Sequence, residues 1–144
     1  MEINRIQNNS TVFQGKFIRN EILEKRINSI YSPDALKDMY NALKRMDAQK
    51  DGKIYKYIEE SRDVENGIGG LDITTDTVAY ITDKKGNKLQ DMLISSESLY
   101  SDGCTNFEAP SDYLKDFICG FVKKFYPEKI NKEEVRNNIF EILD

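Results

Sequence analysis

Two adjacent segments near the N-terminus have the spacing of amphipathic helices. In residues 21–31 the apolar positions fall on one side, and Asn20 before them is a suitable N-cap. A second helix is predicted to start at Ser32, another good N-cap, with Pro33 in its first turn. Its apolar positions recur at helical spacing, at Leu36, Met39, Tyr40, Leu43 and Met46. Each helix is expected to bury one face.

The middle of the chain has the composition of short strands. Residues 54–58, 77–82 and 89–95 are rich in aromatic, β-branched and other apolar side chains. Residues 83–88 read as a hairpin connection in which Gly86 or Asn87 can take a positive φ. A further strand over residues 11–18 is weakened by Gly15. We interpret the charged, glycine-rich residues 61–70 as a loop and the polar residues 96–110 as an unusually long loop, and loops of this length are often functional.

Helical spacing returns after residue 110. Ser111 is the expected N-cap of a strongly apolar helix that runs to Phe125 and ends before Pro127. Asn131 and Glu134 have the spacing of a capping box for a last helix. The order of elements predicts an α+β fold with a small antiparallel sheet of about three to four strands in the middle of the chain, flanked by two N-terminal and two C-terminal helices. Residues 1–10 are expected to be a partly ordered polar tail, and residues 11–144 a single domain.

Composition narrows the chemistry. The 144 residues include no histidine, which removes imidazole-based catalysis and histidine-ligated metal sites. The net charge of −4 disfavours nucleic acid as a partner. Residues 1–13 are polar, no run approaches the ~20 apolar residues of a membrane helix, and Cys104 and Cys119 make no disulfide framework. We therefore expect a cytoplasmic protein with reduced thiols, no membrane association and no cofactor.

One acidic segment resembles the first part of an EF-hand calcium loop. Residues 47–54 (DAQKDGKI) place Asp47 at position one, Asp51 at position five and Gly52 at position six. Gln49 occupies position three, and Ile58 stands at position twelve, where a bidentate Glu is needed. The resemblance makes Asp47 and Asp51 candidate metal ligands, and the alternative is a helix end followed by a turn.

A second acidic set lies on the predicted strands and hairpin. Asp72, Asp83 and Lys85 resemble the acidic residues and lysine of metal-dependent nucleases, in which carboxylates bind Mg²⁺. With Asp76 they give the candidate metal ligands of a carboxylate-based metal-dependent hydrolase or nuclease. This hypothesis needs at least three acidic groups to converge in a cleft.

The hairpin itself resembles those of PAS-like and Cache-like sensor modules. The resemblance rests on residues 79–89 (AYITDKKGNKL) and implies a domain that binds a small molecule. Such a domain would contain an enclosed apolar pocket with a few polar groups.

Our leading interpretation is a non-enzymatic module that binds another protein through the sheet face or the long loop. Tyrosine is common in interfaces, and Tyr55, Tyr57, Tyr80 and Tyr100 form the candidate interaction surface. The alternative for these rings is burial at the edge of the core. The sequence contains no set of residues that converges on a catalytic mechanism.

Overall fold

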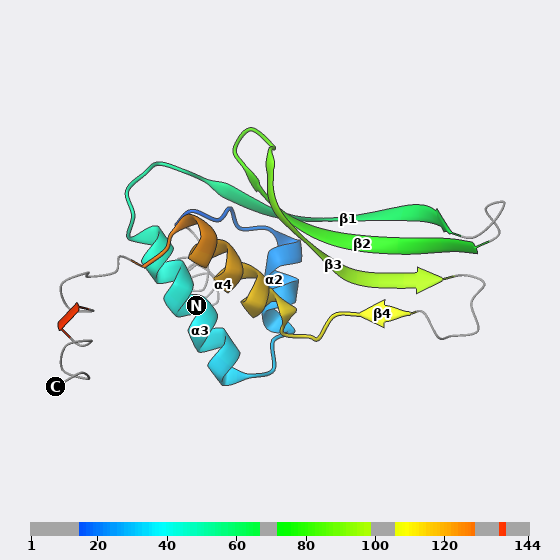
Figure 1. The fold of residues 1–144 in the computed structure, drawn as a ribbon, viewed down its shortest axis with the longest axis horizontal. Coiled ribbons are helices and arrows are strands. Elements are labelled where there is room, and N and C mark those ends of the chain that lie inside the picture. Colours follow the sequence, from blue (N-terminus) through cyan, green and yellow to red (C-terminus); the bar gives the residue numbers. More distant parts are fainter. Residues whose placement is uncertain (1–14, 67–71, 99–105, 129–135, 138–144) are drawn as a thin grey trace, which may run out of the picture.

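The computed structural model describes residues 15–66, 72–98, 106–128 and 136–137. These residues contain α2 (Glu21–Asn28), α3 (Pro33–Asp47), β1 (Tyr55–Asn66), β2 (Asp72–Asp83), β3 (Lys88–Ser98), β4 (Phe107–Glu108) and α4 (Tyr113–Phe125) (Figure 1). The four strands form one antiparallel sheet in the order β1-β2-β3-β4. The predicted α+β class and central antiparallel sheet are confirmed. Residues 1–10 and, apart from residues 136–137, the helix predicted to start at Asn131 lie outside the described residues.

The two N-terminal helices begin at the predicted residues. The Asn20 side chain accepts a hydrogen bond from the Leu23 N–H (2.8 Å), and Ser32 caps α3 by accepting from the Ala35 N–H (3.2 Å). Asn20 also donates its amide N–H to the carbonyl of Tyr57 (2.9 Å), so this one residue ties the start of α2 to β1.

The start of α4 differs from the prediction. This helix begins at Tyr113 after Asp112, and no side chain caps it, so Ser111 is not its N-cap. The prediction relied on the preference of serine for N-cap positions. In the structure the first turn of α4 instead starts where the ring of Tyr113 is buried in the core, and tertiary packing of this kind overrides local propensity.

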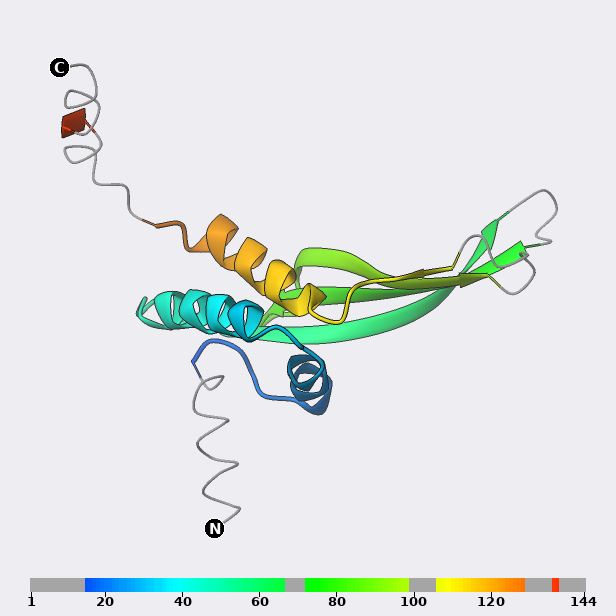
Figure 2. The same cartoon turned by 90° about the horizontal axis from the view of Figure 1, so that it is seen from below.

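The core lies between the helices and the first half of the sheet (Figure 2). Met39 and Met46 of α3 are fully buried, and the predicted apolar positions of α4 are buried from Leu114 to Val122, whereas Phe125 at its end is 37% exposed. Two tyrosines of β1 pack edge-on against α4: Tyr55 lies 4.9 Å from the ring of Phe121, and Tyr57 lies 6.2 Å from Phe117. The predicted apolar stripe of the first helix is only partly buried, because α2 ends at Asn28 and leaves Tyr31 86% exposed.

The β2–β3 hairpin follows the predicted turn chemistry. Gly86 has a φ of 89°, and the Asp83 carboxylate accepts hydrogen bonds from the backbone N–H groups of Lys85 and Asn87 at 2.9 Å. Two register shifts insert Leu89 and Ile94 as extra residues opposite β2. Both side chains pack into or against the core. Bulges increase the local twist of a strand, and here they place Leu89 and Ile94 on the helical side of β3.

The strands are longer than the sequence pattern predicted. β1 continues to Asn66, so residues 61–66 form a strand and not the expected loop. β2 already begins at Asp72, β3 extends to Ser98, and the short strand β4 lies within the segment interpreted as a long loop. These additions are mostly polar, with Val64, Ile73 and Phe107 as exceptions, and therefore lack the regular alternation of apolar and polar residues that indicates a half-buried strand. Residues 67–71 and 99–105 fall outside the described residues.

The segment before α2 forms a single bridge to the sheet. Phe17 pairs in parallel with Tyr55, and the Tyr55 N–H donates to the Lys16 carbonyl (2.6 Å). A side chain at Gly15 would meet the Asp47 carboxylate, because a Cβ there would lie 2.0 Å from the Asp47 Cγ. Of the strand predicted over residues 11–18, the described part therefore contributes one bridge, and residues 11–14 lie outside it.

Asn20 makes two bonds where Ser32 makes one, and the two caps should differ in strength accordingly. We expect Asn20→Ala to lower the free energy of unfolding by about 2 kcal/mol, from a cap of about 1 kcal/mol and a buried bond of about 1 kcal/mol. Ser32→Ala, the matched control, should cost about 1 kcal/mol. Urea unfolding of both variants measures the difference, and equal losses would contradict a role of Asn20 in tying α2 to β1.

Candidate functional site

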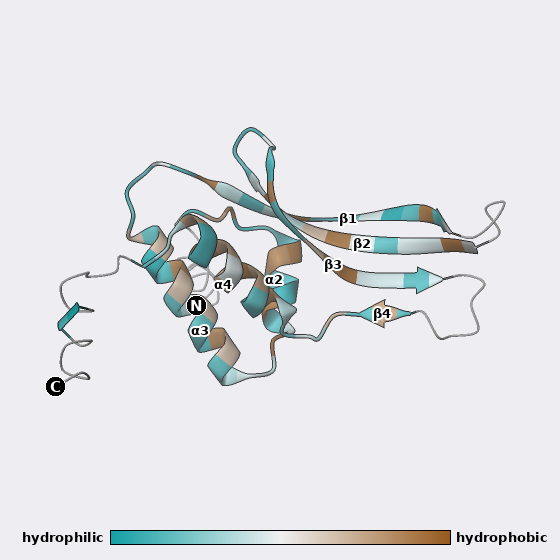
Figure 3. Cartoon of the chain, in the orientation of Figure 1, coloured by the Kyte–Doolittle hydropathy of each residue, from teal (hydrophilic) through white to brown (hydrophobic). Residues whose placement is uncertain are grey.

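The sheet continues beyond the helices that cover its first half. We name this part the sheet extension; it comprises residues 61–65 of β1, 73–77 of β2 and 95–98 of β3. Figures 1 and 2 show it as a blade that projects past α2 and α4 with both faces uncovered. Its side chains are half-buried or exposed, and its surface is mostly hydrophilic (Figure 3).

Hydrogen bonds between neighbouring strands take the place of a core in the sheet extension. Ser61 and Thr77 are joined through their hydroxyls (2.8 Å), and Thr75 donates to Asp63 (2.8 Å). On the other face, Ser96 donates to Asp76 (2.7 Å). Cross-strand pairs of this kind each contribute a fraction of a kcal/mol, so the sheet extension depends on the covered half to align its strands.

The outer edge of β1 is open along the sheet extension. Tyr55 directs its N–H and its carbonyl outward, to Lys16 and Ile18, and the Tyr57 carbonyl points the same way, toward Asn20. The pairing of β1 with β2 has an unbroken register, so the peptide groups of alternate residues point outward along the whole strand. Ser61, Asp63 and Glu65 therefore present their N–H and C=O groups outward, and no described residue pairs with them.

The two faces of the sheet extension differ in charge. Register places Asp63, Thr75 and Glu97 in one row across the face that continues from the covered half. Glu65 shares this face, and so does Glu108, which pairs with Ser95. Within the described part of the sheet extension and β4, no Lys or Arg lies on this face. The opposite face pairs Arg62 with Asp76 in register and is close to neutral.

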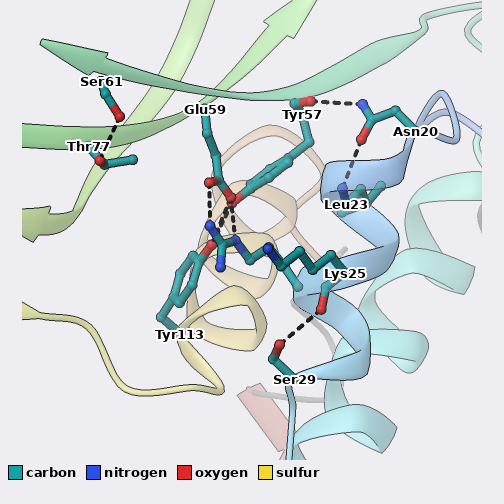
Figure 4. A network of polar contacts seen from close by, with 10 residues as sticks. Asn20, Leu23, Lys25, Ser29, Tyr57, Glu59, Ser61, Thr77 and Tyr113 are labelled. Atoms are coloured by element: carbon teal, nitrogen blue, oxygen red, sulfur yellow. Dashed lines mark hydrogen bonds and ion pairs between the residues drawn. The ribbon is translucent and has the colours of Figure 1, made fainter.

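A buried polar network lies at the end of the covered half, the part of the sheet beneath the helices, where the sheet extension begins (Figure 4). Arg26 of α2 donates two hydrogen bonds to the Glu59 carboxylate (2.7 and 2.6 Å). Tyr57 also donates to Glu59 (2.7 Å), and the hydroxyls of Tyr57 and Tyr113 lie 2.6 Å apart. The network joins α2, β1 and α4 through one carboxylate.

The network fixes the protonation of its members. Burial raises the pKa of Glu59, but the hydrogen bonds from Arg26 and Tyr57 outweigh burial and lower the pKa below its usual 4.5. Burial and the neighbouring hydroxyl raise the pKa of Tyr57, and burial raises that of Tyr113 to about 12. At neutral pH the carboxylate is charged and both tyrosines are neutral, so none of these groups is poised for proton transfer.

A hollow of about 470 Å³ lies next to the network and against the acidic face. Its lining includes Arg26, Tyr113 and the exposed Tyr31 from the helical side, with Ser95 and Glu108 from the sheet. The volume is in the range of small-molecule sites, but the hollow is open and lined by many polar groups. The small-molecule hypothesis remains a prediction.

A second cluster fixes the other end of the covered half. Lys16, although a lysine, is buried, and its ammonium lies 2.6 Å from the Asp51 carboxylate. Tyr126 donates to the other oxygen of Asp51 (2.6 Å), and Tyr55 lies 2.7 Å from the Tyr126 hydroxyl. Burial raises the pKa of Asp51, but the Lys16 and Tyr126 hydrogen bonds outweigh it and lower that pKa overall.

The candidate metal ligands are distributed over separate parts of the fold. Asp51 is bonded to Lys16 and Tyr126, while Asp47 accepts a bond from the Lys16 backbone N–H (2.9 Å). Asp76 and Asp83 lie seven residues apart on β2, and the alternation along a strand places them on opposite faces. The side chain of Asp72 lies outside the described part. No group of three or more cysteines and acidic residues that could bind a metal occurs among the described residues.

The predicted tyrosine surface is corrected by the structure. Tyr55, Tyr57 and Tyr80 are buried, at 3%, 0% and 7% exposure, and Tyr100 lies outside the described residues. Tyr80 is buried on the face away from the helices, where the ammonium of Lys88 lies 3.9 Å from its ring centre. The sequence could not assign these faces because both faces of the covered half carry apolar residues.

Comparisons with family models, curated proteins and solved structures gave no match. Within the described residues, no helix combines the length and apolar character needed to cross a membrane. Function must therefore be inferred from the surface itself.

The buried network predicts how stability depends on pH. The pKa of Glu59 is lower in the folded state, so its stabilisation is present above pH 4.5 and disappears as the pH falls below that value. We expect Glu59→Gln to cost about 2–3 kcal/mol at pH 7, since Arg26 loses its partner but remains partly exposed. The cost should shrink toward pH 3.

Glu60→Gln is the matched control, because Glu60 is the exposed neighbour in β1 and forms only a 3.4 Å ion pair with Lys88. It should change the free energy of unfolding by less than about 1 kcal/mol at either pH. Chemical unfolding at pH 7 and pH 3 measures both variants. A Glu59→Gln cost that is as large at pH 3 as at pH 7 would disprove the assignment of a charged, bonded carboxylate.

Proposed function

We propose that this chain is a protein-interaction module that binds another protein through the sheet extension. The observation that carries the proposal is the uncovered blade with its open outer edge (Figure 2). The sheet extension projects from the core, so its backbone and side-chain groups can be exposed without loss of packing in the core. Natural proteins usually shorten or cover such edges, so a long open one indicates a surface on which something docks.

The polar networks support an anchoring role for the rest of the molecule. The clusters around Glu59 and Asp51 tie α2, β1 and α4 together, and the lowered pKa values of the two carboxyl groups keep both charged at neutral pH. They satisfy one another's hydrogen bonds and leave no activated acid or base among them. We propose a non-enzymatic role on this basis, and a cytoplasmic location from the reduced state expected of its thiols.

The proposal is tested by a partner whose binding depends on the sheet extension. The tagged chain is purified from the cells that make it, and each co-purifying protein is prepared separately and titrated against the purified wild type by calorimetry. A true partner should bind at least about tenfold more weakly to Glu97→Lys, a change on the acidic face worth about 1.4 kcal/mol or more.

Asp38→Lys gives the matched control, with the same charge reversal at an exposed position of α3, away from the blade. It should leave the affinity within about twofold. A partner whose affinity falls equally with both substitutions, or with neither, would contradict the proposed surface. Circular dichroism confirms that each variant is folded.

A further inference from the structure

The open edge and the acidic face together specify the kind of partner. Resting on the function proposed above, we infer that the outer edge of β1 at residues 61–65 receives an extended segment of the partner as an added strand. This segment carries Lys or Arg at every second position, with β-branched or small residues between them.

Backbone geometry supports strand addition at this place. Ser61, Asp63 and Glu65 together present three N–H and three C=O groups along an exposed stretch of edge. The same edge already accepts extended chain at its start, where the segment containing Phe17 bonds to Tyr55 on both sides. Farther along the edge, the Asn20 side chain donates to the Tyr57 carbonyl. The part of the edge proposed for strand addition begins beyond these contacts. An added strand would satisfy the remaining groups in the same way.

Charge complementarity selects the side chains of the added strand. Residues of the added strand that face the acidic side would lie beside Asp63 and Glu65, with Glu97 on the same face two strands away. Opposite charges in cross-strand positions stabilise pairing and like charges oppose it. The intervening residues would lie beside Arg62, whose register neighbour is Asp76, and the half-buried Val64. That side therefore suits uncharged, β-branched residues.

A second copy of this chain fits the edge poorly. Two copies that pair antiparallel through this edge are related by a twofold axis. That axis can pass beside Arg62, Asp63 or Val64, which gives three registers. The first register places Arg62 opposite Arg62, and the second places Asp63 opposite Asp63. The third places Asp63 opposite Glu65. Each arrangement sets like charges directly across from one another, which destabilises the pair. The edge therefore selects a basic partner over itself.

Synthetic peptides test the inference directly. The probe is a seven-residue blocked peptide that alternates Lys and Val, and the comparators are its Glu–Val analogue and a peptide of the same composition with Lys and Val in blocks. Fluorescence anisotropy against the full chain should show the alternating Lys peptide binding at least tenfold more tightly than either comparator. Equal binding of the alternating and block peptides would mean attraction by charge alone and would overturn strand addition.

Variants of the edge separate backbone from charge. Asp63→Ala removes only the carboxylate, whereas Asp63→Pro also removes the outward N–H without touching a bond to β2. Asp63→Pro should bind the peptide about fivefold more weakly than Asp63→Ala, because one hydrogen bond of about 1 kcal/mol is lost. Equal affinities of the two folded variants would contradict the inference.

N-methylation of the peptide keeps the test valid if Asp63→Pro does not fold. Methylating all lysine amides should abolish binding if the strand adds antiparallel, and methylating all valine amides should do so if it adds in parallel. One of the two sets must bind at least tenfold more weakly than the other, and equal effects would overturn the inference. Should the peptides fail while a true partner still depends on Glu97, the edge inference falls and the proposed function stands. Should neither depend on the sheet extension, both fall.

Discussion

The insertion of two tyrosine rings of β1 beneath α4 is the contact on which the rest of the structure depends. Tyr55 and Tyr57 pack against Phe121 and Phe117, and their hydroxyls enter the two polar clusters that join the helices to the sheet. Burial of such large rings contributes more than any polar contact in the sheet extension. Once β1 is fixed at this end, its pairing with β2 continues without a register shift into the sheet extension, whose residues have no core of their own.

This division between a packed end and a projecting end gives the two halves different roles. The packed end pairs its two central carboxylates with cations, Arg26 with Glu59 and Lys16 with Asp51. The projecting end has polar side chains on both faces, an open edge and one acidic face. Because its local stability comes from cross-strand pairs, an added strand would stabilise it, and binding would couple to its order.

The sequence was sufficient for the elements that bury an apolar face and insufficient for those that do not. Helical spacing predicted α3 and the run of buried residues in α4, and Asn20, Ser32 and Gly86 marked real starts and turns. The sheet extension went unpredicted, because Thr and charged residues on both faces leave no period of two. The high content of β-branched residues in 73–78 (ITTDTV) was the signal that could have revealed it. The buried tyrosines and Lys16 depend on long-range pairing, which spacing along the chain does not encode.

Amide hydrogen exchange of the isolated protein tests the central claim most directly. An ordered sheet extension with an open outer edge requires alternation along β1: the amides of Arg62 and Val64, bonded to β2, should exchange slowly, and those of Ser61, Asp63 and Glu65 quickly. Uniformly slow exchange would mean that the edge is already covered. Uniformly fast exchange would mean that the blade does not form, and either result would contradict the account.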